Sequence, residues 1–226
     1  MDYRHELKFI VTTADLALLR AKLSNIIKTD TNQDDEEGYI ITSLYFDDVY
    51  NTCLKENING YDKRDKYRLR LYNNSTELIK LERKSKVNGM TAKISADVNS
   101  GECAQFMDSH IPWLDKANSA VKNKLLCEMK LKGMMPKCIV QYEREAFVYR
   151  PGNVRITFDK NISGSLNTDT FMNSKILTVP LLGKDIHVLE VKYDNMLPAF
   201  IAELLETEKL QRTAFSKYAY ARQTLG

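Results

Sequence analysis

The chain has 226 residues, of which 43% are hydrophobic and 28% charged, a composition typical of a globular protein long enough to bury a core. Its net charge of +3 does not by itself predict a nucleic-acid binder, and no apolar run approaches the roughly 20 residues that span a bilayer. The four cysteines form no C-x-x-C pair and charge begins at the second residue, so we predict no zinc or redox motif, no signal peptide, and a reduced cytoplasmic protein.

In chain order, alternating and β-branched segments predict about eight strands, at residues 3–11, 39–47, 66–73, 77–86, 92–98, 138–149, 154–161 and 186–194. The third and fourth form a hairpin with a loop at 74–76, and 150–153 is a turn between the sixth and seventh. The acidic stretch 34–38 is predicted to be a solvated loop, and 57–60 a connection.

Helical periodicity separates some of these strands. Thr13 is a plausible cap for a first helix, whose apolar stripe is Leu16, Leu19, Leu23 and Ile26. A helical insertion is predicted at about 101–133, because Leu114, Ala117, Val121, Leu125 and Met129 fit one helix face. A helix after Pro198 carries Phe200, Ile201, Leu204 and Leu205, and a terminal helix contains residues 215–218. We expect one domain over 1–226, mainly β within the α+β class, with helices packed outside.

The strands share one further pattern, in which charged residues occupy one face and apolar residues the other. Arg68 and Arg70 alternate with leucines, and Glu190 and Lys192 alternate with Leu189 and Val191. On a single strand this describes the solvent face of an ordinary antiparallel sheet. Its recurrence on five or six strands favours an eight-stranded antiparallel closed barrel whose charged faces point inward and bind a polyanion.

Positive charge is concentrated on these faces. The inward-facing positions carry an excess of six positive charges, which focuses field on an anionic ligand. The cations are Arg4, Lys8, Arg68, Arg70, Lys80, Lys84, Arg144, Arg155, Lys192 and Lys217, and the carboxylates are Glu6, Glu82, Asp159 and Glu190.

Several of these residue types are suited to phosphate chemistry. Arg68 and Arg70, one strand step apart, can grip successive phosphate oxygens, and Tyr142 and Arg144 add a donor and a third guanidinium. Glu190 is either a salt-bridge partner or the ligand of a divalent ion that keeps positions open for phosphate; Glu82 and Glu6 have the same two uses. By its sequence context alone Lys217 is a surface lysine.

Other chemistries are not indicated. Three scattered histidines form no nucleophilic triad, glycine-rich phosphate loops are absent, and aromatic residues do not interleave with the basic ones as RNA stacking requires.

Seven short segments in order resemble the polyphosphate polymerase domain of the vacuolar transporter chaperone (VTC) family. They are Arg4–Phe9, Tyr67–Tyr72, Leu81–Lys84, Gln141–Arg144, Arg155–Thr157, Leu189–Lys192 and Ser216–Tyr218. That family belongs to the triphosphate tunnel metalloenzymes (CYTH-like superfamily), so the resemblance implies an eight-stranded antiparallel barrel around a basic tunnel. The larger eukaryotic members add a regulatory domain and membrane helices. This sequence has neither, so the resemblance does not imply membrane insertion by this chain, although it leaves room for a membrane partner.

The resemblance also implies roles for individual residues. Positions that hold phosphate match Lys8, Arg68, Arg70, Lys84, Arg144, Arg155, Lys217 and Tyr142; Lys80 and Lys192 share their faces. Glu190 matches the carboxylate that holds manganese or magnesium, and Glu82 assists.

The implied reaction is transfer of the γ-phosphoryl group of ATP to phosphate or a growing polyphosphate chain. One alternative is a triphosphatase acting on tripolyphosphate, thiamine triphosphate or a nucleoside triphosphate. Hydrolytic relatives open with Glu-x-Glu-x-Lys, where this chain has Arg4, Glu6 and Lys8, which removes one carboxylate and favours transfer. A second alternative is a non-catalytic polyphosphate- or nucleotide-binding module.

Overall fold

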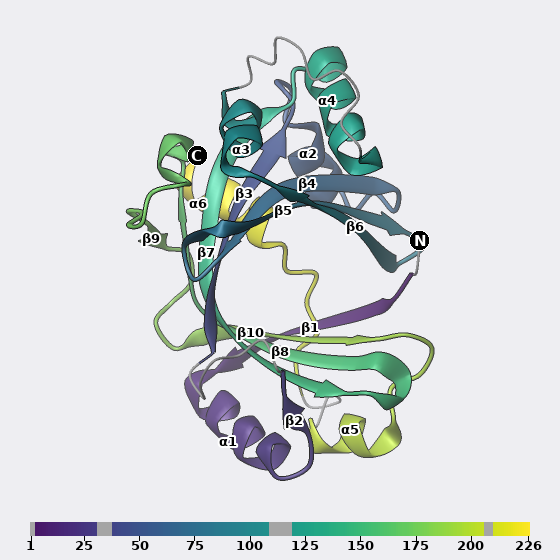
Figure 1. The fold of residues 1–226 in the computed structure, drawn as a ribbon. Helices are drawn as coiled ribbons and strands as arrows, with labels where there is room; N and C mark the ends of the chain where they lie inside the picture. Colours follow the sequence, from purple (N-terminus) through teal and green to yellow (C-terminus); the bar gives the residue numbers. More distant parts are fainter. Residues whose placement is uncertain (1–2, 31–37, 109–118, 206–209) are drawn as a thin grey trace.

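Eight long antiparallel strands form one strongly curled sheet (Figure 1) in the order β1-β10-β8-β7-β3-β4-β5-β6. The structure is a computed structural model that describes residues 3–30, 38–108, 119–205 and 210–226. The long strands are β1 His5–Thr12, β3 Tyr39–Asp47, β4 Arg64–Tyr72, β5 Ser75–Val87, β6 Met90–Val98, β7 Met135–Tyr149, β8 Val154–Ser165 and β10 Ile186–Tyr193. Two short strands, β2 Lys28–Thr29 and β9 Val179–Pro180, pair with β7 and β8.

The ends of this sheet meet at one bridge between Arg4 and Thr91. The backbone N–H of each residue donates to the carbonyl of the other, at 2.9 and 3.0 Å. The antiparallel barrel predicted from the sequence is therefore confirmed. Its seam between β1 and β6 is held by these two backbone hydrogen bonds, whereas neighbouring long strands elsewhere in the barrel are joined by longer ladders.

Two-residue turns close the hairpins on either side of β5. Asn73 and Asn74 both have positive φ, as do Asn88 and Gly89, which matches the right-handed twist of the flanking strands. The predicted loop at 74–76 was wrong by one or two residues, because asparagine tolerates the left-handed conformation and lets both strands run further.

Helices cover the outside of the barrel. They are α1 Thr13–Ser24, α2 Thr52–Ile58, α3 Ser100–Met107, α4 Ala120–Lys132, α5 Ala199–Leu204 and α6 Lys217–Leu225, with short 3₁₀ turns at Pro151–Asn153 and Thr168–Thr170. Across the described ranges, none of these helices combines the length and apolarity needed to cross a membrane. The cytoplasmic location stays a prediction.

Four details of the predicted helices and connections were wrong. The cap of α1 is Thr12, which forms a capping box with Asp15, and Ile26 lies exposed beyond the helix end while Ile27 is buried. The predicted connection at 57–60 contains the end of α2. The terminal helix begins only at Lys217, because Ser216 caps it.

The helical insertion is confirmed for its described parts, α3 and α4, where Val121, Leu125 and Met129 are buried. Leu114 and Ala117 lie outside the described residues, as do residues 34–37 of the predicted acidic loop.

Apolar residues pack between the outer barrel wall and the helices. Leu16, Leu19 and Leu23 of α1 and Ile201 of α5 form one cluster with the outward side chains of β1, β8 and β10, including Phe9. A second cluster lies under α2, α3, α4 and α6 against β3, β4, β5 and β7. Since the outer faces are covered in this way, the charged residues of the same strands point into the barrel.

Candidate active site

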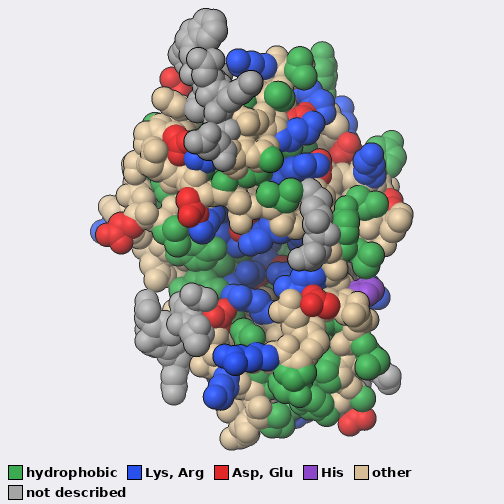
Figure 2. Space-filling view, turned by 45° about the vertical axis from the view of Figure 1, so that its right-hand side comes forward, with side chains coloured by type: hydrophobic (Ala, Val, Ile, Leu, Met, Phe, Trp, Pro, Cys, Tyr) green, Lys and Arg blue, Asp and Glu red, His purple; other side chains and the backbone are tan. Residues whose placement is uncertain are grey.

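The inner faces of the strands converge on one cavity of about 950 Å³. Strand register brings charged residues side by side, since Lys8 pairs with Glu190 and Glu6 with Lys192 across β1 and β10. Figure 2 shows lysine and arginine side chains gathered in a hollow on this face of the molecule.

Cations dominate the described lining of this cavity, with fourteen basic and three acidic side chains. The bases are Arg4, Lys8, Arg64, Lys66, Arg68, Arg70, Lys84, Lys86, Lys93, Arg144, Arg155, Lys192, Arg212 and Lys217; the acids are Glu6, Glu190 and Asp194. A barrel interior with this charge excess attracts a polyanion of several phosphates.

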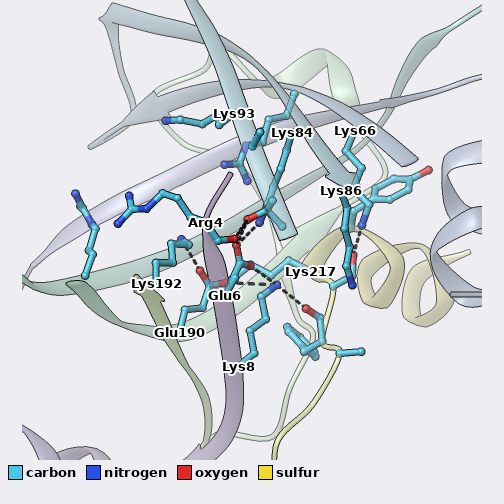
Figure 3. Close-up of a pocket in the computed structure, with 18 of the residues that line it drawn as sticks. Arg4, Glu6, Lys8, Lys66, Lys84, Lys86, Lys93, Glu190, Lys192 and Lys217 are labelled. Atoms are coloured by element: carbon cyan, nitrogen blue, oxygen red, sulfur yellow. Dashed lines mark hydrogen bonds and ion pairs between the residues drawn. The ribbon is translucent and has the colours of Figure 1, made fainter. Parts of the chain in front are cut away.

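Glu190 and Glu6 lie at the centre of the cavity, surrounded by lysines (Figure 3). The carboxylate of Glu190 contacts Lys192 Nζ at 2.9 Å, Lys217 Nζ at 3.0 Å, Arg144 Nη2 at 3.6 Å and Lys8 Nζ at 3.7 Å. Burial would raise the pKa of Glu190, but Lys192, Lys217 and Lys8 outweigh burial and hold its pKa well below its usual range. Glu190 is therefore ionised at neutral pH.

Lys217 reaches this centre from the first turn of α6. Its ammonium group is buried and contacts Asp159 at 2.5 Å and Glu190 at 3.0 Å, and it lies 4.7 Å from the centre of the Tyr142 ring. Burial would lower its pKa, but Asp159 and Glu190 raise it above the ordinary value. The structure thus places in the cavity a residue that the sequence alone described as a surface lysine.

Three arginines of the cavity lining are held by carboxylates and tyrosines. Arg144 makes a bidentate pair with Asp159, with both N···O distances at 2.7 Å. Arg70 donates to the Tyr142 hydroxyl at 3.2 Å. Arg155 contacts Asp30 at 2.6 Å and donates to the hydroxyl of Tyr39 at 3.1 Å.

Arg68 and Glu82 form a buried pair in the wall, with Arg68 Nη2 at 2.6 Å from the carboxylate. Glu82 also contacts Lys93 at 2.9 Å and Arg70 at 3.7 Å. Arg68 donates in addition to the Tyr45 hydroxyl at 3.1 Å. Tyrosines and carboxylates of the barrel wall therefore hold the guanidinium groups in place, which lowers the entropic cost of binding a phosphate.

The cavity lining also includes basic residues that our sequence analysis missed, among them Arg64, Lys66 and Lys86. Figure 3 shows Lys66 and Lys86 on the far side of the Glu6–Glu190 pair from Lys192. Lys66 donates to Ser216 Oγ at 2.8 Å, and burial with the nearby Lys8 and Lys84 lowers its pKa well below the ordinary value. The alternation that marked Arg68 and Arg70 continues through Arg64 and Lys66, so the signal was present in the sequence.

The segment 210–216, which leads into α6 (Figure 1), lines the same cavity through residues 212–216. Arg212 forms an isolated antiparallel β-bridge with Phe9. The backbone N–H of Thr213 donates to the carbonyl of Lys8 at 2.9 Å. The Lys8 ammonium group donates to the Phe215 carbonyl at 2.8 Å. These bonds fix the approach to α6 and hence the position of Lys217.

The model of the VTC domain matches residues 3–225. The chain belongs to the VTC domain family. No curated protein matches it by sequence. Solved structures resemble it in fold at low identity. The candidate adenylyl cyclase HpAC1 from Hippeastrum, whose dominant activity is that of a triphosphatase, superposes with a TM-score of 0.60 at 16% identity over 99% of this chain and 96% of that one.

Two bacterial structures described as candidate adenylate cyclases show the same similarity. The one from Bacillus halodurans has a TM-score of 0.56 at 12% identity and covers 96% of each chain. The one from Vibrio parahaemolyticus has a TM-score of 0.53 at 14% identity and covers 97% of each. At these identities the likeness shows the fold, so this VTC domain has the triphosphate tunnel fold.

The cavity of this VTC domain contains eleven of the thirteen residues predicted for the site: Glu6, Lys8, Arg68, Arg70, Lys84, Tyr142, Arg144, Arg155, Glu190, Lys192 and Lys217. Lys80 and Glu82 share the inward face of β5 but do not line the cavity. Lys80 forms an ion pair with Asp97 instead. Arg4, at the cavity edge, pairs with Asp194 at 2.9 Å.

The oxygen donors of this VTC domain fit a divalent cation that binds together with phosphate. Glu6 and Glu190 both contact Lys8 Nζ, at 3.2 and 3.7 Å, so their carboxylates face one point in the cavity. Within the described ranges no group of three or more acidic, histidine or cysteine side chains forms a complete protein cage. Mg²⁺ and similar ions bind one or two carboxylates and take their other ligands from phosphate and water. Glu82 fits less well, because Arg68, Arg70 and Lys93 already engage its carboxylate.

Proposed function

We propose that this VTC domain is an ATP-dependent polyphosphate polymerase. It transfers the γ-phosphoryl group of ATP to phosphate or to the end of a growing polyphosphate chain inside the barrel, with Mn²⁺ or Mg²⁺. The family and the tunnel fold support an enzyme that acts on triphosphates.

One observation supports transfer to a phosphate acceptor in particular: cations extend on both sides of the central carboxylates. Lys192 lies on one side, with Arg155 beside it across β10 and β8, and Lys66 and Lys86 lie on the other. A hydrolase needs one anion site beside a water, whereas a polymerase needs a donor site and an acceptor site in line. Lys66 contacts no carboxylate among the described residues, and its donation to Ser216 Oγ leaves further N–H donors for an acceptor phosphate.

The side chains supply positioning and charge neutralisation. Arg68, Arg70 and Arg144 hold the triphosphate of the donor, and Lys217 reaches the transferred group from α6. An acceptor oxygen forms the new bond to the γ-phosphorus while the bond to the β,γ-bridging oxygen breaks and ADP leaves with that electron pair. The acceptor oxygen is already ionised, so no general base is needed. A divalent ion on Glu190 and Glu6 would neutralise charge on the phosphate oxygens.

The second candidate is a triphosphatase, which the dominant activity of HpAC1 favours. Arg4 argues against it. Where hydrolytic relatives carry a first carboxylate, this chain has a guanidinium that pairs with Asp194 at the cavity edge, which leaves one metal ligand fewer for activating water.

A single assay separates these functions. The purified protein is incubated with ATP and Mn²⁺ or Mg²⁺, and the phosphate products are resolved by gel electrophoresis. We expect polyphosphate and ADP, with synthesis lost in Glu190→Gln and Arg68→Ala proteins that remain folded. Release of orthophosphate alone would establish the triphosphatase, and tight binding without turnover under either metal would establish the non-catalytic module.

The partners that follow from the proposal are ATP, phosphate and polyphosphate, with no nucleic acid. Adding membranes to the reaction and following polyphosphate into them tests whether a membrane partner accepts the product.

A further inference from the structure

The central carboxylates are held by an excess of counter-ions. Four cations of the described ranges contact Glu190: Lys8, Lys192, Lys217 and Arg144. Two contact Glu6, of which Lys84 is the closer at 2.6 Å, and two contact Asp159, Arg144 and Lys217.

Taken together, five different cations contact these three carboxylates in the described part of the chain. The cluster therefore carries two more positive than negative charges before any ligand binds. All of these side chains are buried or half-buried, so water screens the repulsion between them and an approaching cation only weakly. A free divalent ion at Glu190 would have to displace Lys192 and Lys217 from this carboxylate, which would leave Lys217 with Asp159 alone and cost Lys192 its 2.9 Å contact.

From this arrangement we infer that Glu190 takes a divalent metal ion only when a triphosphate is also bound, so that the metal–triphosphate complex, and not the free metal ion, is the species the site accepts. This rests on the proposed function insofar as the anion is a triphosphate.

An exchange of ion-pair partners by the lysines explains why the metal ion binds only together with the triphosphate. A nucleoside triphosphate carries three to four negative charges near neutral pH, more than enough to cancel the excess of two. Its oxygens provide Lys8, Lys192 and Lys217 with new partners within reach of their present positions, which frees the carboxylate of Glu190. Because the coupling is reciprocal, the metal bound at Glu190 must also strengthen triphosphate binding.

Equilibrium dialysis tests this without turnover. The full chain is dialysed against Mn²⁺ alone and against Mn²⁺ with the β,γ-imido analogue of ATP, and Mn²⁺ and nucleotide are measured on both sides. We expect the wild-type protein alone to retain no more Mn²⁺ than Glu190→Gln does. With the analogue present, the wild type should retain about one Mn²⁺ per bound nucleotide, and Glu190→Gln several-fold less Mn²⁺ per bound nucleotide.

A double variant, Lys8→Met with Lys192→Met, tests the cause. It removes two of the five cations, so the three carboxylates are balanced and the protein should retain Mn²⁺ in the absence of nucleotide. Its matched control is Lys80→Met with Lys93→Met, which removes two charges that contact Asp97 and Glu82 instead and should retain none. Thermal unfolding with and without Mn²⁺ reports folding and gives a second readout of binding.

Two results would overturn the inference. One is wild-type protein that retains one Mn²⁺ per chain without nucleotide and loses it in Glu190→Gln. The other is a folded Lys8→Met, Lys192→Met protein that retains no Mn²⁺. Failure to synthesise polyphosphate would overturn the proposed function and leave these binding results unaffected.

Discussion

The hydroxyl of Tyr218 donates a 2.5 Å hydrogen bond to the carboxylate of Asp47, and both groups are buried. Asp47 also accepts the backbone N–H groups of Cys53 and Leu54 in the first turn of α2. Since Tyr218 directly follows Lys217, this bond ties the start of α6 to the end of β3 and fixes the point from which Lys217 reaches Asp159 and Glu190.

Replacing Tyr218 by phenylalanine removes this bond while keeping the ring against Tyr45. A buried acceptor that loses its donor costs about 1–3 kcal/mol, so we expect the free energy of unfolding to fall by that amount in a denaturant titration. Turnover of ATP should fall more than its binding, because the arginines that hold the donor are on other strands. Tyr220→Phe is the matched control on the same helix, and its more exposed side chain predicts a change within about 0.5 kcal/mol. Equal effects of the two substitutions would contradict the role given to Asp47.

Lys84 gives phosphate binding a dependence on pH. Burial, aided by Lys8 and Lys192 and opposed by Glu6, lowers the pKa of Lys84 from 10.5 to about 8. As pH rises through 8 the ammonium group loses its proton, so affinity for tripolyphosphate should fall between pH 7 and 9. Calorimetric titration measures this. Lys84→Arg should keep its affinity up to pH 9, because a guanidinium stays protonated there, and an identical fall in the arginine variant would exclude Lys84 as the cause.

The lowered pKa of Lys84 weakens anion binding as pH rises, but it increases the stability of the folded protein over the same direction of pH change. Between pH 8 and 10.5 the unfolded chain binds more protons at Lys84 than the folded one, so the contribution of this residue to the free energy of unfolding rises with pH across that window. In the absence of anions, the unfolding free energy of wild type minus that of Lys84→Met should therefore increase from pH 8 to pH 10. A decrease would show that the folded protein holds the proton more tightly than the unfolded chain.

Arg20 and Glu145 form a bidentate pair on the outside of the barrel, with both N···O distances at 2.7 Å. Glu145 is buried under α1, so removing its partner leaves a poorly solvated carboxylate. Arg20→Ala should lower the unfolding free energy by about 1.5–3 kcal/mol, measured in denaturant, with unchanged KM for ATP because the pair faces away from the cavity. A shifted KM at unchanged stability would place this pair in the site after all.

Lys66 separates acceptor from donor binding. We expect Lys66→Met to raise the KM for added short polyphosphate by about tenfold or more, the loss of one charge-assisted hydrogen bond, and to change the KM for ATP little. Initial rates with each substrate varied in turn measure both constants. Lys80→Met, which removes a lysine outside the cavity that is paired with Asp97, is the control and should leave the acceptor KM unchanged. A Lys66→Met protein with a raised KM for ATP alone would assign this side of the cavity to the donor.

Much of the barrel was predictable from the sequence, because strand alternation is a local property. Arg68 and Arg70, or Glu190 and Lys192, must share a face once the backbone is extended. Eight strands with their apolar faces outward then require a helical cover, and the periodicity of Leu16, Leu19 and Leu23 showed where part of it lies. The same rule applied further along β4 would have included Arg64 and Lys66.

What could not be predicted depends on residues distant in sequence. Helix α2 is capped largely by Asp47, which precedes it by five residues, so no local capping pattern marks its start. Lys217 has an ordinary sequence context and reaches the cavity only because segment 210–216 pairs with Lys8 and Phe9.

Chain order and strand period by themselves determined which charges face inward in this protein. Only the tertiary structure decided which of them engage one another. Among the residues that the structure describes, Glu190 contacts four cations, Lys66 contacts no carboxylate, and Lys80 lies outside the cavity. The reason is that alternation specifies a side of each strand, whereas the height of a residue within the barrel depends on how neighbouring strands are staggered, and that stagger is set by packing and by bulges far away in the sequence.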